Sequence, residues 1–161
     1  MLIAVDFISL DALEATLPAA DLAVLSLGDP DAGQPVNLHR FPWYSRLEFL
    51  DVDPRETELR DPQMACLPWQ MQEIIEFIER IHLDPEHWRL AVHCTFGSSR
   101  SAAAALIAHA MTSCQMPRHT EAHGANAWML LLAQGPLGQP ISVPAKPEPD
   151  TYTYLTSRLQ I

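Results

Sequence analysis

The sequence predicts a three-layer α/β domain, in which helices flank a central, mostly parallel sheet of four or five strands. Three observations predict this fold class. Over the first 135 residues, short apolar runs typical of strands alternate with segments whose apolar residues recur at helical spacing. No linker-like break, internal repeat or low-complexity tract interrupts the alternation, and 161 residues suffice for one buried core. We therefore expect a single domain over 1–161, ending in a proline-rich tail from about 136 to 161.

Four apolar or alternating segments are expected as strands: 2–5, 22–27, 46–52 and 89–93. Glycine and proline residues mark 28–35 as a loop after the second strand. Five acids, two arginines and a proline mark 51–61 as an exposed loop after the third.

Helices are expected between these strands. The first covers 10–17, because Ser9 can cap its amino terminus and Pro18 ends it. Pro68 suits the first turn of the second helix. Its apolar residues recur at three- and four-residue steps and form one face: Met71, Ile74, Ile75, Ile78 and Ile81.

Three further elements complete the prediction. The segment 101–111 is a helix with almost no polar side chain, so we expect it to be central and buried. Another helix covers 125–133, and a short final element lies near 152–159.

The composition is acidic and argues against polyanionic partners. Twenty Asp and Glu residues outnumber ten Lys and Arg residues, which gives a formal net charge of −10. Nucleic acids and anionic membranes bind through clustered cations, so neither is expected as a partner. No apolar run could span a bilayer, no secretory leader is visible, and three cysteines are an odd and sparse set. We expect free thiols and a cytoplasmic protein.

Chemistry is concentrated in the segment from Leu90 to Ala104, which reads LAVHCTFGSSRSAAA. A strand runs into Cys94, a short loop follows, and a helix starts at Arg100. This geometry turns the backbone N–H groups of the loop inward at the positive end of the helix dipole, which makes a site for a phosphate-sized anion. The expected phosphate-binding residues are Thr95, Phe96, Gly97, Ser98, Ser99 and Arg100.

Each residue type at this loop has a chemical task. Cys94, beside N–H donors and a guanidinium, is expected to have a lowered pKa and to act as a nucleophile in its thiolate form. Arg100 presents a planar fork that can grip two phosphoryl oxygens. Ser101 can donate its hydroxyl to the leaving thiolate, and Gly97 allows a close backbone approach or a positive φ. His93 is expected to order the loop from behind the cysteine.

The pattern His-Cys-x5-Arg-Ser, from His93 to Ser101, resembles the signature loop of the cysteine-dependent protein tyrosine and dual-specificity phosphatases. The strand, loop and helix at 89–111 follow that family closely, and the helix with Met71 to Ile81 fits it in order and spacing. Three shorter stretches are similar to small bacterial phosphatase-like proteins: Ser26 to Pro30, Gly124 to Asn126, and Leu137 with Gly138. The resemblance implies a phosphatase-like fold and a phosphomonoester hydrolase, with a protein-tyrosine phosphatase as the expected class.

The resemblance also implies a two-step mechanism that needs no metal or other cofactor. Cys94 attacks phosphorus to give a phosphocysteine, an aspartic acid protonates the leaving oxygen, and the same aspartate then activates water. The expected substrates are a phosphorylated protein or a small aryl phosphate, because Phe96 at the rim suits an aryl ring and the loop carries no extra cation for multiply phosphorylated lipids. A zinc site at Cys114, His119 and His123 is not expected, because a fourth ligand is not evident. The oligomeric state stays open.

Three aspartates are candidates for the general acid, which the family places on a loop before the cysteine. Asp51 directly follows the strand-like stretch 47–50 and best resembles the bacterial group, although 43 residues separate it from Cys94. Asp61 has the usual separation of 33 residues but lies just before a helix, and Asp53 is intermediate. We favour Asp51 and keep the other two as alternatives.

Two other functions would use a loop of this kind. A phosphate-binding module that kept the loop but lost efficient turnover is the alternative, because the sequence does not fix the general acid. Sulfur transfer by a rhodanese-like protein also uses a cysteine-centred loop, but the ending Arg100-Ser101 is typical of the phosphatases. An active phosphatase is therefore the favoured interpretation.

Overall fold

The structure, a computed structural model, describes residues 1–56 and 62–147. Four strands form one sheet: β1 (Leu2–Ser9), β2 (Leu22–Gly28), β3 (Trp43–Glu48) and β4 (Trp88–Cys94). Their order is β1-β4-β2-β3, and every neighbouring pair is parallel. The strands β4 and β2 are therefore central, and all four carboxyl ends meet at one edge of the sheet.

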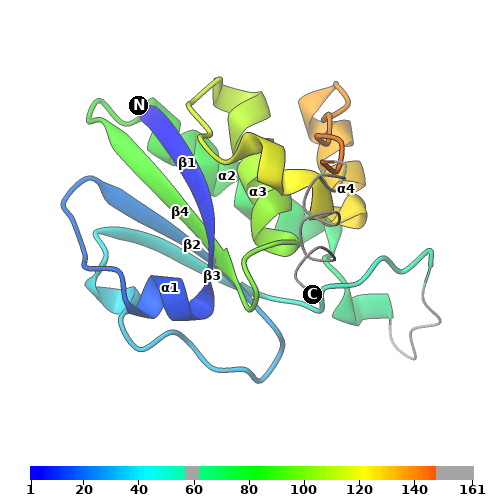
Figure 1. The fold of residues 1–161 in the computed structure, drawn as a ribbon, viewed down its shortest axis with the longest axis horizontal. Coiled ribbons are helices and arrows are strands. Elements are labelled where there is room, and N and C mark those ends of the chain that lie inside the picture. Colours follow the sequence, from blue (N-terminus) through cyan, green and yellow to red (C-terminus); the bar gives the residue numbers. More distant parts are fainter. Residues whose placement is uncertain (57–61, 148–161) are drawn as a thin grey trace, which may run out of the picture.

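Helices cover both faces of this sheet, which makes three layers (Figure 1). One face carries α2 (Pro68–Leu83), α3 (Arg100–Thr112) and α4 (Ala127–Leu137), and the other carries α1 (Leu10–Glu14) and the 3-10 turn η1 (Leu38–Arg40). Two more 3-10 turns, η2 (Pro62–Met64) and η3 (His119–Gly124), precede α2 and α4. The predicted three-layer α/β architecture with a central parallel sheet is confirmed.

The larger of two apolar cores lies between the sheet and α2, α3 and α4. The apolar face predicted for α2 is buried in it: Met71, Ile74, Ile75, Ile78 and Ile81. The helix α3 is buried at nine consecutive positions, from Arg100 to Ala108, which confirms the expected central helix. A smaller core on the other face joins Leu13 of α1 and Leu38 of η1 to the sheet.

The end of the first helix was predicted wrongly. Ser9 caps its start through Oγ, as expected, but α1 ends at Glu14, three residues before the predicted limit. The buried amide of Asn37 donates to the carbonyl oxygens of Leu13 (2.9 Å) and Thr16 (3.3 Å). These bonds satisfy carbonyl groups at the carboxyl end of the helix, so a distant residue fixes where α1 stops.

The strands β1 and β3 differ most from their predicted limits, whereas β2 and β4 differ by at most one residue at either end. The strand β3 begins and ends earlier than 46–52, because the N–H of Leu50 already donates to the carbonyl of Met64 (2.6 Å), outside the sheet. The strand β1 extends beyond 2–5 to Ser9, because its whole length pairs with β4. Asp51 therefore lies beyond the sheet edge.

The helix α4 corrects the prediction at the carboxyl end of the chain. It begins at Ala127, two residues after the start of the predicted 125–133 helix, and runs through Pro136 to Leu137, so the tail expected from about 136 starts inside a helix. Pro136 lacks the N–H that would donate to the carbonyl four residues before it, so the helix loses a hydrogen bond in its last turn, and Gly138 closes it at a φ of +66°. The element expected near 152–159 lies outside the described residues. Within residues 1–56 and 62–147, no helix is both long and apolar enough to cross a membrane.

The buried face of α2 provides a test of the fold. Ile78 is completely buried, so Ile78→Ala should lower the free energy of unfolding by about 2–5 kcal/mol through lost burial and a residual cavity. Urea denaturation measures this change. Glu79→Ala, at the next and exposed position of the same helix, should change stability by less than about 0.5 kcal/mol. Equal effects of the two substitutions would contradict the orientation of α2.

Candidate functional site

The loop between β4 and α3, residues 94–100, is the cysteine loop. Its central residue, Gly97, has a φ of +69°, and a Cβ atom there would overlap the backbone of Ile8 and Ser9 at the end of β1. Glycine is therefore required at this position for two reasons: its positive φ and the close approach of the β1 backbone. The N–H of Leu10 also donates to the carbonyl of Thr95 (3.3 Å), which ties the loop to the start of α1. The role predicted for Gly97 has this structural basis.

Cys94 ends β4 and is almost fully buried. Burial raises the pKa of its thiol, but the hydroxyl of Ser101 and the backbone N–H groups of Ser101, Ser98 and Gly97 lower it more, so the pKa lies below the ordinary value of 9.0. The Sγ atom lies 3.2 Å from the Oγ of Ser101. The local environment therefore favours the thiolate, as the sequence predicted.

Behind the cysteine, a polar row crosses three strands at one level of the sheet. Arg46, Ser26 and His93 are register partners on β3, β2 and β4. Arg46 donates from Nη1 to the Oγ of Ser26 (2.9 Å), and that Oγ lies 2.6 Å from Nε2 of His93. Gly28 leaves room for the row, because a Cβ atom there would overlap the Arg46 guanidinium.

His93 is neutral near physiological pH. Burial and the guanidinium of Arg46 lower the pKa of His93 to about 4, and the backbone of Cys94 offsets this only in part. A neutral imidazole that accepts the Ser26 hydroxyl hydrogen at Nε2 carries its own hydrogen on Nδ1. That Nδ1 has no hydrogen-bond partner of ordinary geometry among the described residues. His93, directly before Cys94, is therefore joined to β2 and β3 through Ser26 and Arg46, and the supporting role expected for it stays a prediction.

Arg100 is the first residue of α3, and its side chain is only 3% exposed. Its Nη1 donates to the carbonyl oxygen of Phe49 (2.6 Å) and pairs with Oδ1 of Asp29 (2.8 Å). Its Nη2 donates to Oγ1 of Thr95 (3.3 Å). The buried Nε has no partner in the described part of the chain. A buried and unpaired N–H is unusual, and here it leaves one edge of the guanidinium free to bind a ligand.

Asp51, the favoured acid candidate, lies against the cysteine loop. Its Oδ1 accepts hydrogen bonds from Oγ of Ser99 (2.7 Å) and from Nδ2 of Asn126 (2.8 Å). The backbone N–H of Asn126 donates in turn to the carbonyl of Ser99 (3.2 Å). The side-chain oxygen of Asn126 accepts from the N–H of Met129 and so caps α4. Asn126 therefore connects Asp51, the cysteine loop and α4.

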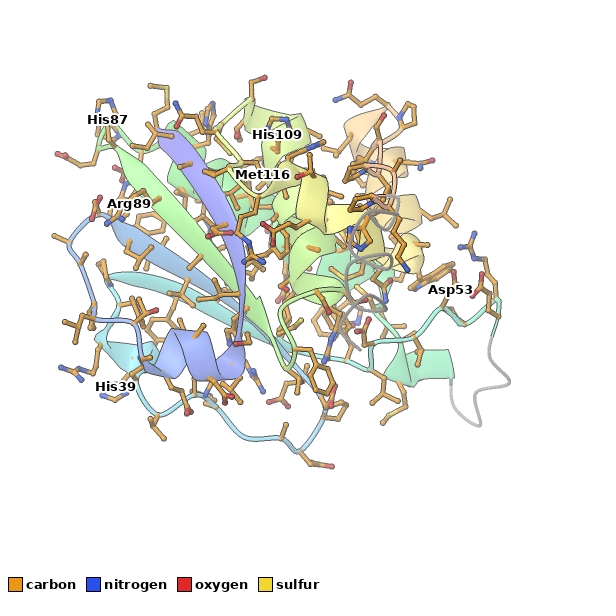
Figure 2. All side chains as sticks on the ribbon, in the orientation of Figure 1. His39, Asp53, His87, Arg89, His109 and Met116 are labelled. Carbon is orange, nitrogen blue, oxygen red and sulfur yellow. The ribbon has the colours of Figure 1, made fainter. Side chains whose placement is uncertain are left out.

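The other two acid candidates do not share this position. Asp53 lies on the outlying loop at the right of Figure 2 and is hydrogen-bonded to Arg55, with 2.9 Å between Nε and Oδ1. The guanidinium of Arg55 lowers the pKa of Asp53 to about 2, so this carboxyl carries no proton near neutral pH. Asp61 lies outside the described residues. Among the described candidates, Asp51 is thus the one that contacts the cysteine loop.

The structure adds two residues that the sequence analysis did not assign to the site, Asp29 and Asn126. Both belong to stretches that were noted only for their similarity to bacterial proteins. The sequence did contain a signal for Asp29, because an acid directly after a strand is placed at the carboxyl edge of a parallel sheet.

Phe96, expected at the rim of the cysteine loop, is 83% exposed.

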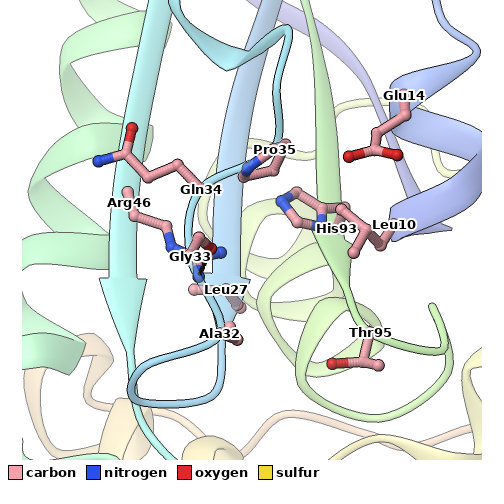
Figure 3. Close-up of a pocket in the computed structure, with 11 residues that line it drawn as sticks. Leu10, Glu14, Leu27, Ala32, Gly33, Gln34, Pro35, Arg46, His93 and Thr95 are labelled. Atoms are coloured by element: carbon pink, nitrogen blue, oxygen red, sulfur yellow. Dashed lines mark hydrogen bonds between the residues drawn. The ribbon is translucent and has the colours of Figure 1, made fainter.

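A small cavity of about 110 Å³ adjoins the cysteine loop on the α1 side of the sheet (Figure 3). Leu10 and Glu14 line it from α1, and His93 and Thr95 line it from β4 and the loop. Neither Cys94 nor Arg100 lines this cavity. It therefore lies behind the loop rather than at the nucleophile.

Metal ligands do not gather in the described part of the chain, where no group of three or more His, Cys, Asp or Glu side chains could hold an ion. No family model matches the chain, and neither the curated proteins nor the solved structures contain a match to it. Its function is therefore inferred from the geometry of the cysteine loop.

The three thiols should differ in reactivity. Burial raises the pKa of Cys66 to about 12 and also raises the pKa of Cys114, whereas the pKa of Cys94 is lowered. Because the thiolate is the reactive form, iodoacetamide should modify Cys94 selectively at pH 7, with a midpoint in the pH profile below pH 9.0. Peptide mass spectrometry locates the modified residue, and Cys94→Ser should remove the fast reaction. Faster labelling of Cys66 or Cys114 would contradict this assignment.

Proposed function

We propose that the protein is a phosphomonoester hydrolase of the cysteine-dependent protein tyrosine or dual-specificity phosphatase type. One observation carries the proposal: a single loop combines a thiol with a lowered pKa and a buried guanidinium whose Nε–H has no partner among the described residues. A thiolate is a strong nucleophile, and a guanidinium edge matches two oxygens of a phosphoryl group. The two groups together suit the attack of sulfur on a phosphate ester.

The proposed reaction has two steps. In the first, Sγ of Cys94 bonds to phosphorus as the bond from phosphorus to the leaving oxygen breaks, and Asp51 gives that oxygen its proton. In the second, water attacks phosphorus and gives a proton to Asp51, while the S–P bond breaks and the thiolate leaves with a hydrogen bond from Ser101. Arg100 and the backbone N–H groups of the loop stabilise the charge on the phosphoryl oxygens in both steps.

The proposed substrates are phosphotyrosine in a protein or a small aryl phosphate. The exposed ring of Phe96 offers an apolar surface at the loop rim. The loop positions between Cys94 and Arg100 are uncharged, which suits one phosphoryl group rather than several. A cytoplasmic location belongs to the proposal as well, since all three cysteines are free and a thiolate nucleophile is lost by oxidation.

A phosphate-binding module without efficient turnover is the second candidate. One observation favours it: Oδ1 of Asp51 accepts hydrogen bonds from Ser99 and Asn126, so the carboxylate is held against the protein rather than free to follow a leaving group. Binding of phosphate would then need only the cysteine loop and Arg100.

Hydrolysis of an aryl phosphate separates the two candidates. The wild-type protein should hydrolyse p-nitrophenyl phosphate, and Cys94→Ser should lower kcat by more than about 10³-fold, because a serine hydroxyl is a far weaker nucleophile. The matched control is Cys114→Ser, a buried cysteine outside the loop, which should keep the activity. Release of nitrophenolate by Cys94→Ser at the wild-type rate would contradict the nucleophile. Binding of phosphate without turnover in the wild type would support the binding module instead.

The role of Asp51 depends on the leaving group. Asp51→Asn should lower kcat by about 10²- to 10⁴-fold for phenyl phosphate, whose oxygen must be protonated as it leaves. The loss should be much smaller for p-nitrophenyl phosphate, which needs little protonation. Steady-state kinetics on both esters measure the difference, with Asp53→Asn as the control that should match wild type. An unchanged rate for Asp51→Asn would transfer the role to Asp61.

A further inference from the structure

We propose that Asp29 is the positioning residue of the anion site: its carboxylate holds one end of the Arg100 guanidinium so that the opposite edge is presented to the bound anion. Asp29 directly follows β2, and its Oδ1 lies 2.8 Å from Nη1 of Arg100. This role deepens the proposed function and rests on it. Asp29 does not touch the phosphoryl group in this role and acts only through Arg100.

The hydrogen bonds of Arg100 show which edge is left. A guanidinium has five N–H donors: two on each Nη and one on Nε. Nη1 donates to the carbonyl of Phe49 (2.6 Å) and forms an ion pair with Oδ1 of Asp29 (2.8 Å). Nη2 has one acceptor, Oγ1 of Thr95 at 3.3 Å, and the buried Nε has none among the described residues. The edge formed by Nε and Nη2, opposite the ion pair with Asp29, is therefore the edge with a free N–H, and a guanidinium edge of this kind can bind two phosphoryl oxygens.

Asp29 supplies the charge among the partners of this buried cation. The acceptors from Phe49 and Thr95 are neutral, and the side chain of Arg100 is only 3% exposed. Taking a cation out of water is unfavourable unless a nearby anion and hydrogen bonds compensate. The Asp29 side chain is 45% exposed, so it offers this compensation while its own charge stays hydrated.

The backbone around Asp29 is well suited to hold a side chain in place. The N–H of Ala32 donates to the carbonyl of Asp29 (3.1 Å), which closes a four-residue turn. Pro30 occupies the second position of that turn, and Asp31 occupies the third with a φ of +68°. Proline followed by a residue of positive φ is typical of a type II turn, whose conformation is restricted. Asp29 therefore starts a hydrogen-bonded turn, in which Pro30 restricts the backbone of the next position.

Asp29 forms its ion pair with Arg100 and not with the neighbouring Arg46. Arg46 packs over Gly28, the residue before Asp29, but its Nε and Nη2 bond to Glu48 (3.3 and 3.2 Å). Its Nη1 donates to Ser26. Arg46 and Arg100 thus have separate carboxylate partners, and the structure pairs Asp29 with the arginine of the cysteine loop.

Other roles for Asp29 predict opposite results. A general acid would act on the leaving oxygen, so its loss would harm poor leaving groups most. An anion that competes with the phosphoryl group for Arg100 would weaken binding, so its removal would strengthen it. A positioning residue acts on the contacts between Arg100 and the phosphoryl oxygens, and these contacts are the same for every phosphate ester.

The test compares Asp29→Asn, Asp29→Glu and Asp31→Asn with wild type. Asp29→Asn should lower kcat/KM by about 10- to 100-fold, and by the same factor for p-nitrophenyl and phenyl phosphate, because a small misplacement of a binding group has effects of this size. The inhibition constant of inorganic phosphate should rise, and Asp29→Glu should recover part of the loss. Asp31→Asn removes an exposed carboxylate from the same turn and should match wild type, since asparagine tolerates positive φ. Thermal unfolding shows whether each variant is folded.

Each outcome decides the assignment. A larger loss of activity on phenyl phosphate would make Asp29 a general acid. Tighter phosphate binding by Asp29→Asn would make Asp29 a competitor of the phosphoryl group, and unchanged activity would exclude any role. Each of these three results overturns the proposal while leaving the phosphatase intact. Calorimetry with inorganic phosphate covers the opposite case. If the wild type binds phosphate without turnover and Asp29→Asn binds it more weakly, the hydrolase is wrong and the positioning role stands. If the wild type neither binds nor hydrolyses, both proposals fail.

Discussion

The buried guanidinium of Arg100 is the interaction on which this edge of the molecule depends. It lies at the amino terminus of α3, where the helix dipole is itself positive, so the position is unfavourable for a cation. Three acceptors offset this: the carbonyl of Phe49 after β3, the carboxylate of Asp29 after β2 and the hydroxyl of Thr95 after β4. The loops that follow three neighbouring strands are thereby joined at one charged group.

The sheet brings these loops within reach of one another. In a parallel sheet, the segments that follow the strands all leave at the same edge, and ligands bind there. The order β1-β4-β2-β3 places the end of β4 next to the end of β2, and β3 next to β2. Cys94 ends β4, Asp29 follows β2 and Asp51 follows β3, so residues far apart in the chain lie at the ends of adjacent strands. The polar row of Arg46, Ser26 and His93 crosses the same three strands and ends at His93, the residue before Cys94.

Features that depend on a few consecutive residues could be predicted from the sequence. Ser9 caps α1 because an Oγ can reach a backbone N–H three residues on, and the apolar face of α2 follows from its isoleucine spacing. The loop after Cys94 belongs to this group, since a strand, a glycine and a helix start are all local signals.

Features that depend on strand order could not be predicted. The limit of α1 is set by Asn37, and the end of β3 by a bond from Leu50 to Met64, and neither pairing has a local pattern. The sequence favoured Asp51 only because it follows a strand-like stretch, and it did not assign Asp29 to the site. Only the pairing of β2 with both β4 and β3 shows that they contact the same loop as Cys94.

The overall acidity of the chain and an anion site are compatible because they act over different distances. The formal net charge of −10 creates a repulsive field for anions, but salt screens exposed charges beyond roughly 8–10 Å. Binding at the cysteine loop would depend instead on a buried guanidinium and backbone N–H groups at hydrogen-bond distance, where screening is weak. A polyanion must contact an extended surface and meets the acidic exterior along its length. In the proposed function one phosphoryl group would enter only the loop, so the acidic exterior does not argue against a single phosphate monoester as the substrate.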